Sequence, residues 1–455
     1  MATYDFRGDA PAIAQVDTCQ ITAYDAATTY TLTINGKSVS VIAAGSVNDT
    51  ASDLAAAWNA ETNGEFAEVT AAANTDTITF TADTAGKPFT ITSSKSGGTG
   101  TIGSVTNSTA NSGPNALVAA NFRNVSTGAN ALPTTGDTIH FRDSDVDLLY
   151  GLDALSGETL TRVRCWASYT GKIGLPNKNI DNSSATYDEY RERRLKVGIT
   201  NLDIGEDDGS QSTRLWFDLE NVQNTTIVHN TGNRESTEAP AVTLHGTHAS
   251  NAYTVWKGDV GLAAFSGDAT TISALTVHGG QVVAYDGAAA AGTIRVDDGS
   301  LTISSNITTL YLTKGAVNTS GSNTITTANV TGGKLNHLSD GTITTCNQDG
   351  GQVVSYGTIT THNCDSGNAT IHGSATLGTC NLTGGTIDYR SSGNVTTLNV
   401  GGGESQAVFD SRNAPTDLAV ATPTLHVNGV IRRAKGQTYT NDIAVDAGVR
   451  EVTAA

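Results

Sequence analysis

The sequence is poor in several residue types, and each shortage excludes a class of protein. Only 15% of its 455 residues are charged, and 26 Lys and Arg face 44 Asp and Glu, so the formal net charge is −18. Phosphate binding needs clustered Lys and Arg, so this balance argues against nucleic acid and against an anionic membrane surface. Hydrophobic residues make up only 38% of the chain, whereas Gly alone contributes 49 residues. Together with abundant Thr, Ser and Asn, this composition excludes a long helical protein.

Long apolar runs and paired cysteines are also missing. No apolar segment approaches the roughly 20 residues that span a bilayer, so we expect no membrane insertion. The first ten residues lack a cationic region followed by an apolar core, so they do not read as a secretory signal. The five cysteines are odd in number and match no zinc or CxxC spacing. We therefore expect free thiols, assembly in a reducing cytoplasm, and no metal or other cofactor.

A small α+β unit is predicted over residues 19–102. Alternating apolar residues on both sides of Asn35-Gly36 predict a hairpin, since both residues tolerate the positive φ of a type I′ turn. A helix is expected from about Ala51 to Asn59, capped by Thr50. Two further alternating segments, 77–82 and 88–92, predict strands that complete the unit.

A repeat with a period near 18 residues dominates the second half of the chain. Its rungs start at Ile307, Ile325, Ile343, Ile359, Leu377 and Val395, at intervals of 18, 18, 16, 18 and 18. A fixed period without helical spacing indicates a β-solenoid in which each turn stacks on the last. The rungs lack the branched residue at every sixth position that a left-handed hexapeptide helix needs. We therefore predict an all-β dominated fold, a right-handed parallel β-helix preceded by the small α+β domain.

The columns of this repeat assign roles to individual side chains. Positions 1, 4 and 6 of each rung face inward, and Gly-Gly pairs turn the corner. Position 5 holds asparagines that can hydrogen-bond from rung to rung in a ladder, namely Asn329, Asn347, Asn363, Asn381 and Asn399. Cys346, Cys364 and Cys380 fall in inward columns of successive rungs and are predicted to be a stack of core thiols. A Cys/His metal site with His362 is the less favoured reading, because stacked strands hold side chains parallel rather than converging.

The predicted organisation divides the chain into six parts. The stretch 137–271 has irregular spacing, so it is either a separate β-domain or the start of the same solenoid. The parts are an N-terminal arm (1–18), the α+β domain (19–102), a linker (103–136), the irregular β-region (137–271), the regular β-helix (272–403) and a C-terminal tip (404–455).

Catalytic motifs are absent from this pattern. A glycan-cleaving site needs two carboxylates across a groove. The available acids, among them Asp297, Asp340 and Asp388, fall at different rung positions, and no Trp follows Trp256. We therefore predict that the chain is not an enzyme. The mixed charges of residues 187–194 predict a salt-bridged surface or a subunit contact rather than a nucleic-acid site.

Two parts of the chain resemble structural proteins of tailed bacteriophages. The segments TYTLTINGKSVSV and TITFTADTAGKPFTI resemble a small domain that recurs in such proteins. The solenoid resembles the β-helical trunks of tail spikes, tail fibres and head appendages, and HFRDSDVDLLYGLDAL, YTGKIGLP and LHGTHAS look like segments of prophage virion proteins. The resemblance implies a homotrimeric virion surface protein, anchored to other tail or capsid proteins through its N-terminal domain and contacting a host surface glycan.

Three alternatives remain open at this point. A capsid decoration or head fibre protein would share this composition. A polysaccharide depolymerase tail spike would need the paired acids that the repeat does not display. A secreted bacterial adhesin would need an export signal.

Overall fold

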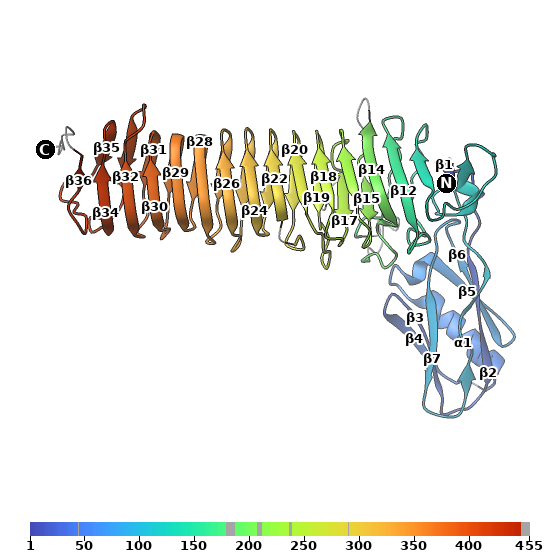
Figure 1. Ribbon diagram of the computed structural model, residues 1–455. Coiled ribbons are helices and arrows are strands. Elements are labelled where there is room, and N and C mark those ends of the chain that lie inside the picture. The colour runs from blue at the N-terminus through green and yellow to red at the C-terminus, as the bar shows by residue number, and fades with distance from the viewer. Residues whose placement is uncertain (44, 179–186, 207–211, 236–238, 290, 447–455) are drawn as a thin grey trace. The chain divides into compact units, whose positions relative to one another are not determined.

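The computed structural model describes residues 1–43, 45–178, 187–206, 212–235, 239–289 and 291–446 (Figure 1). Strands account for 48% of the chain and helix for 5%, and a β-solenoid of about 13 turns extends over residues 195–445. The predicted parallel β-helix with a small preceding domain is therefore confirmed. The chain forms two compact units, which we describe separately: one holds residues 1–163, 168–198 and 214–218, and the other holds 164–167, 199–213 and 219–455.

The first unit contains the small N-terminal domain. It has one three-stranded sheet in the order β4-β3-β7 and a five-stranded sheet in which β5, β6, β2 and β8 are neighbours and β9 also pairs with β2. The elements are β2 (Val16–Ala23), β3 (Thr29–Ile34), β4 (Lys37–Ile42), α1 (Val47–Ala60), η1 (Phe66–Glu68), β5 (Val69–Asn74), β6 (Thr77–Ala82), β7 (Ile91–Ser96), β8 (Thr101–Ile102) and β9 (Thr106–Thr109).

The hairpin between β3 and β4 forms at the predicted turn. Asn35 and Gly36 have φ angles of 47° and 72°, the left-handed values that a type I′ turn requires at both positions. The alternation of TYTLTI then buries Tyr30, Leu32 and Ile34 on one face of β3. The turn and the alternation therefore agree on a single register.

Two local predictions in this domain need correction. Helix α1 is capped by Ser46 rather than Thr50, because the Ser46 hydroxyl accepts the backbone N–H of Asp49 and the helix begins one turn earlier. The strand expected at 88–92 is displaced to Ile91–Ser96, where six residues pair with β3. Trp58 packs edge-on against Phe66 and Phe80 and donates its indole N–H to the carbonyl of Val69 at 2.7 Å, so it belongs to the core.

The remainder of the first unit is held together by an aromatic cluster. The chain start forms β1 (Thr3–Phe6), which pairs with β10 (Phe122–Asn124) and in parallel with β11 (Thr138–Phe141). Phe6 contacts Phe122, Phe141 and Tyr169 with ring centroids 5.4–6.3 Å apart. The further elements are η2 (Ala119–Asn121), β12 (Thr159–Trp166), which enters the second unit, and the parallel pair β13 (Leu195–Lys196) and β15 (Leu215–Asp218).

The second unit is a column of parallel strands, in which each turn contributes one strand to each of two faces (Figure 1). The first face contains β14 (Gly198–Glu206), β16 (Thr225–Val228), β18 (Ala252–Val255), β20 (Ala274–Val277), β22 (Ala291–Val296), β24 (Ile307–Leu312), β26 (Ile325–Val330), β30 (Leu377–Leu382), β32 (Val395–Val400), β34 (Val420–Leu425) and β36 (Ala444–Val445). The second face contains β17 (Val242–His245), β19 (Asp259–Leu262), β21 (Gln281–Ala284), β23 (Ser300–Ile303), β25 (Ala316–Thr319), β27 (Lys334–His337), β31 (Gly385–Tyr389), β33 (Ala407–Asp410) and β35 (Gly429–Arg432). Two longer strands, β28 (Ile343–Ser355) and β29 (Ile359–Ile371), serve both faces.

The rung starts predicted from the repeat coincide with strand starts. Strands β24, β26, β28, β29, β30 and β32 begin at the six predicted residues, and positions 1, 4 and 6 are buried in each. The same parallel register continues upstream, where β16 pairs with β18 and β18 with β20. The described part of residues 219–271 thus consists of turns of the solenoid. Of the two possibilities that the sequence left open for this stretch, it is the start of the β-helix and not a separate β-domain.

Glycines at the corners permit close stacking of the turns. Gly333, Gly351 and Gly385 have φ angles of 65°, 63° and 77°, which disfavour any residue with a Cβ. A Cβ on Gly351 would lie 2.6 Å from the backbone of the preceding rung at Gly332. Within the described residues, no helix combines the length and apolar character needed to cross a membrane.

Candidate functional site

The five asparagines of position 5 form a continuous hydrogen-bonded ladder. Each Nδ2 donates to the Oδ1 of the asparagine one rung earlier at 2.9 Å, in four consecutive bonds from Asn399 to Asn329. The parallel register of β26 to β32 places these residues directly opposite one another. The ladder is half-buried and internally satisfied, so its role is to hold the rungs together.

The three thiols lie in the solenoid core. Cys346, His362 and Cys380 occupy one inward column on three successive rungs. Cys364 lies in the adjacent inward column, directly opposite Gln348 of the preceding rung. All three cysteines are buried and free. Burial raises the pKa of Cys346 and of Cys364 to about 12, so both remain protonated. Protonated thiols are poor nucleophiles and poor metal ligands.

His362 is a neutral core residue. Burial lowers its pKa to about 4, and its Nε2 donates to Oε1 of Gln348 at 3.1 Å. Gln348 in turn donates to the carbonyl of Asn368 at 3.0 Å. In the part of the chain that the structure describes, no group of three or more His, Cys, Asp or Glu side chains has the geometry to hold a metal ion. The arrangement thus favours the thiol-stack reading over the metal site.

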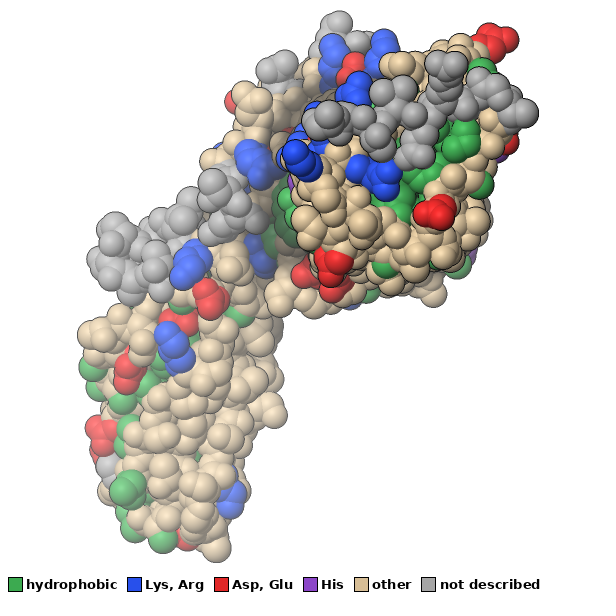
Figure 2. Space-filling model, turned by 90° about the vertical axis from the view of Figure 1, so that its left-hand side faces the viewer, with side chains coloured by type: hydrophobic (Ala, Val, Ile, Leu, Met, Phe, Trp, Pro, Cys, Tyr) green, Lys and Arg blue, Asp and Glu red, His purple; other side chains and the backbone are tan. Residues whose placement is uncertain are grey.

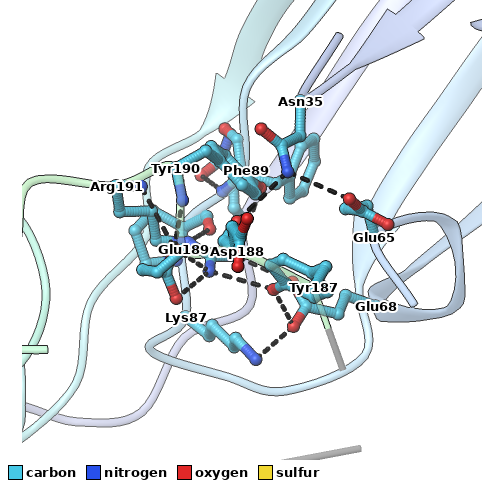
Figure 3. Close-up of polar contacts among 12 residues, drawn as sticks. Asn35, Glu65, Glu68, Lys87, Phe89, Tyr187, Asp188, Glu189, Tyr190 and Arg191 are labelled. Atoms are coloured by element: carbon cyan, nitrogen blue, oxygen red, sulfur yellow. Dashed lines mark hydrogen bonds and ion pairs between the residues drawn. The ribbon is translucent and has the colours of Figure 1, made fainter. Parts of the chain in front are cut away.

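The predicted salt bridges of the charged segment 187–194 form, and those of residue 191 join the segment to other parts of the same unit (Figure 3). Asp188 stays 79% exposed, whereas the side chains that meet at Glu68 are withdrawn from solvent. Arg191 donates to Oε2 of Glu68 at 2.7 Å and to Oε1 of Glu189 at 2.8 Å, and Lys87 and Tyr187 also bond Glu68. The side chains of Glu68, Lys87, Glu189 and Arg191 are each at most 9% exposed. We call these four residues and Tyr187 the charged cluster.

Opposing effects set the ionisation of this cluster. Burial alone raises the pKa of Glu68, but the guanidinium of Arg191 and the hydrogen bonds from Lys87 and Tyr187 outweigh it and hold that pKa below its usual value. Two cations and two carboxylates therefore neutralise each other out of water. The cluster fastens residues 187–191 to the β5 and β7 region of the N-terminal domain.

An exposed strip on the first face of the solenoid has the character of a binding surface. Trp256, His278 and Asp297 each follow a first-face strand by one residue, and their N–H groups bond successive rungs. The Trp256 indole is 49% exposed and stacks on the His278 ring with centroids 3.9 Å apart. Nδ1 of His278 lies 3.1 Å from Oδ2 of Asp297. With Arg295 and Tyr311, whose guanidinium and ring lie 5.0 Å apart in the next column, these residues form what we call the tryptophan strip.

A second strip lies on the other face, nearer the C-terminus. Tyr356, His372 and Arg390 follow successive second-face strands, and the Tyr356 and His372 rings stack with centroids 4.9 Å apart. Arg412 continues this row on the next rung, and Arg432 lies one rung further in the neighbouring outward column, opposite Asp410. Both arginines pair with Asp410. We call these five residues the arginine strip. Figure 2 shows Lys and Arg side chains gathered at the C-terminal end of the solenoid.

Two aspartates beside the arginine strip, Asp388 and Asp410, form a pair that the sequence analysis did not identify. Asp388 and Asp410 are directly opposite in the register of β31 and β33, so they lie on adjacent rungs. Arg390 bonds Asp388, and Arg412 bonds Asp410. Both strips could have been found in the sequence by aligning the rungs and comparing the residue that follows each strand. In that alignment Trp256, His278 and Asp297 fall in the same column.

Comparisons with known proteins do not indicate a function. No family model, no curated protein and no solved structure matches the chain. Function must therefore be argued from the solenoid and its two strips.

Proposed function

We propose that the chain is a structural protein of a tailed-phage virion, a β-helical surface appendage of tail-fibre or tail-spike type that attaches the particle to its host. The observation that carries the proposal is the tryptophan strip. A solenoid that served only as a spacer would present Thr, Ser and Asn on every rung. Here an indole that is 49% exposed stacks on an imidazole that is braced by a carboxylate. Exposed aromatic rings beside fixed polar groups are typical of recognition surfaces.

The construction of the solenoid supports a role outside the cell. Its backbone hydrogen bonds run between rungs, its inward columns are mostly apolar, and its thiols stay free without weakening it. A stable fold of this kind needs neither a disulfide nor a metal. A net charge of −18 keeps neighbouring copies soluble and mutually repelling. In the proposal the protein forms a homotrimer on the virion surface, and the N-terminal domain anchors it to other virion proteins.

The proposed role is binding rather than cleavage. Asp388 and Asp410 lie on adjacent rungs, about 4.8 Å apart along the solenoid, a spacing near that of retaining glycosidases. Such an enzyme needs one carboxyl with a raised pKa as its general acid. The hydrogen bond from Arg412 instead lowers the pKa of Asp410. Incubation with a host polysaccharide should therefore release no reducing ends, and their release would favour the depolymerase alternative.

A map of the intact particle tests the main proposal. We expect the chain at the tail or baseplate surface with threefold symmetry and with its N-terminal domain inward. Density on the capsid would favour the decoration or head fibre alternative, and absence of the chain from purified particles would refute a virion role altogether. Particles carrying Trp256→Ala should adsorb to cells more slowly, whereas Tyr24→Ala, a matched exposed aromatic in the N-terminal domain, should leave adsorption unchanged.

A further inference from the structure

The C-terminal rungs carry a concentration of cations that the rest of this acidic chain does not lead one to expect. The outward column Thr370, Asp388, Asp410 and Arg432 runs over four rungs in register. Arg390 and Arg412 lie beside it and are 47% and 56% exposed, while Arg432 is 48% exposed. These three arginines face two aspartates, and Arg433 and Lys435 follow in the sequence. With Glu404 and Asp417 included, residues 388–435 hold five cations and four carboxylates, a balance of +1 in a chain of net charge −18.

The aspartates orient the arginines without saturating them. Arg390 donates from Nε and Nη2 to one oxygen of Asp388, at 2.8 Å and 2.5 Å. Arg412 donates from Nε and Nη2 to the carboxylate of Asp410, and a guanidinium nitrogen of Arg432 lies 3.9 Å from the same carboxylate. A guanidinium has five N–H donors in a planar fork, so donors remain on each arginine to engage a second oxyanion. Fixed, half-exposed forks bind carboxylates and phosphates with less entropic cost than mobile lysines do.

A stacking platform lies in line with these forks. Tyr356 is 46% exposed, and its ring is nearly parallel to that of His372, at 12°. Hydrogen bonds from the N–H groups of Tyr356, His372 and Arg390 to residues on the preceding rungs place all three in one column. At about 4.8 Å per rung, the five rungs from Tyr356 to Arg432 extend about 19 Å. An aromatic platform followed by regularly spaced anion-binding groups matches a linear polymer whose units repeat both a ring and a negative charge.

We propose that the arginine strip binds an acidic polysaccharide, one whose repeating units carry carboxylate or phosphate groups. The inference goes beyond the virion role and does not depend on it, since the strip would bind such a polymer wherever the chain resides. A nucleic acid is disfavoured because Asp388 and Asp410 interrupt the cations, whereas phosphate-backbone sites use uninterrupted Lys and Arg. The acidic remainder of the surface repels polyanions and so directs them to this strip.

The test measures binding of the full-length protein to defined polymers at low ionic strength. The probes are polygalacturonate, which carries carboxylates, a phosphorylated mannan, neutral dextran, and a single-stranded oligonucleotide. We expect binding to at least one of the two acidic polysaccharides, none to dextran, and affinity that falls as salt rises. The two acidic probes distinguish carboxylate from phosphate as the recognised group. Equal affinity for dextran, tighter binding of the oligonucleotide, or no binding to either acidic polymer would overturn the proposal.

Variants locate the site. Arg412→Met and Arg390→Met should each weaken binding about tenfold, because each removes a charge-assisted hydrogen bond. Tyr356→Ala should weaken it without altering its salt dependence. Arg234→Met is the matched control, since Arg234 is 34% exposed and also pairs with an aspartate, Asp259, but lies outside both strips. Unchanged melting temperatures will show that the variants fold. If Arg234→Met weakens binding as much as Arg412→Met, the arginine strip is not the site.

Discussion

Replacement of Arg191 by methionine should detach the segment 187–191 from the N-terminal domain. The guanidinium donates to Glu68 at 2.7 Å, to Glu189 at 2.8 Å and to the carbonyl of Pro88 at 2.6 Å, and its side chain is only 8% exposed. Methionine fills much of the same volume but leaves both carboxylates buried without this cation. Removal of one partner from a buried ion pair generally costs about 3–5 kcal/mol.

The expected magnitude lies at the lower end of that range. Glu68 keeps its bonds from Lys87 and Tyr187, and Glu189 keeps, among the described residues, the backbone N–H groups of Tyr190 and residue 191, each at 3.0 Å. A loss of about 3 kcal/mol in local opening free energy corresponds to exchange roughly 100-fold faster. Hydrogen–deuterium exchange of the full chain, followed by mass spectrometry of peptides covering 66–74 and 187–198, measures this directly.

The neighbouring pair of Lys178 and Asp188 provides the control. These side chains are 57% and 79% exposed and their charged atoms lie 3.9 Å apart, so Lys178→Met should change exchange by less than about threefold. The double variant Glu68→Gln with Arg191→Met should cost less than the sum of the single changes, because it removes the uncompensated charge. The reasoning fails if Arg191→Met behaves like Lys178→Met, or if the two single changes are additive.

Acid should open the same cluster. The pKa of Glu68 is held below its usual value in the folded chain, so the unfolded state binds a proton more readily as the pH falls. The stability that this carboxylate contributes is fully present above the ordinary glutamate value of about 4.3 and is lost as the pH drops through the lower folded pKa. Exchange at residues 187–198 should therefore accelerate below about pH 4.3, and Glu68→Gln should remove that acceleration.

Three further predictions concern the solenoid. Asn363→Ala removes two ladder bonds and Asn399→Ala only one, so urea unfolding should show losses near 2 and 1 kcal/mol, and equal losses would contradict a continuous ladder. Because burial lowers the pKa of His362 to about 4, the unfolded state gains a proton first below about pH 6.5. Acidification to pH 5 should thus cost about 2 kcal/mol, and a His362→Leu variant that retained this dependence would refute the assignment. All five cysteines are buried, so iodoacetamide at pH 8 should leave the native chain unmodified and label five sites after denaturation, with native labelling as the contrary result.

The regular part of the solenoid was predictable because its register and its residue pattern carry the same information. The rungs from Ile307 to Val395 repeat an apolar residue at positions 1, 4 and 6, with Gln348 and His362 as the polar exceptions, and parallel pairing requires those positions to coincide. Asparagine recurs at position 5 because a stacked amide can satisfy its neighbour. A periodic physical requirement leaves a periodic trace in the sequence.

The turns upstream of the regular repeat have a less regular sequence period. Strands β16, β18, β20 and β22 have first paired residues at 225, 252, 274 and 293, so successive turns contain 27, 22 and 19 residues. Insertions at the corners change the period but leave the strand register intact, since loops on the surface tolerate added length. Hence the sequence left 137–271 ambiguous although residues 219–271 stack in the same way.

The burial of the charged cluster was not predicted, for a different reason. Arg191 follows Glu68 by 123 residues, and no local spacing connects them. A run of mixed charges usually lies on a solvated face, and only the fold brings a buried carboxylate and Lys87 to meet it. The N-cap at Ser46 shows the same limit on a smaller scale, because Thr50 also satisfied a capping pattern and its hydroxyl instead bonds the carbonyl of Ser46.

The stacking that builds the core also determines what the surface can recognise. Since inward side chains fix each rung at about 4.8 Å from the next, outward side chains at one position form a row with that same repeat. Trp256, His278 and Asp297 form one such row, and Tyr356, His372 and Arg390 form another on the opposite face. Both rows place an aromatic ring on a histidine and then a charged group on the following rung. A ligand that engages more than one rung must therefore repeat along its own length, which favours a polymer over a small molecule on either face.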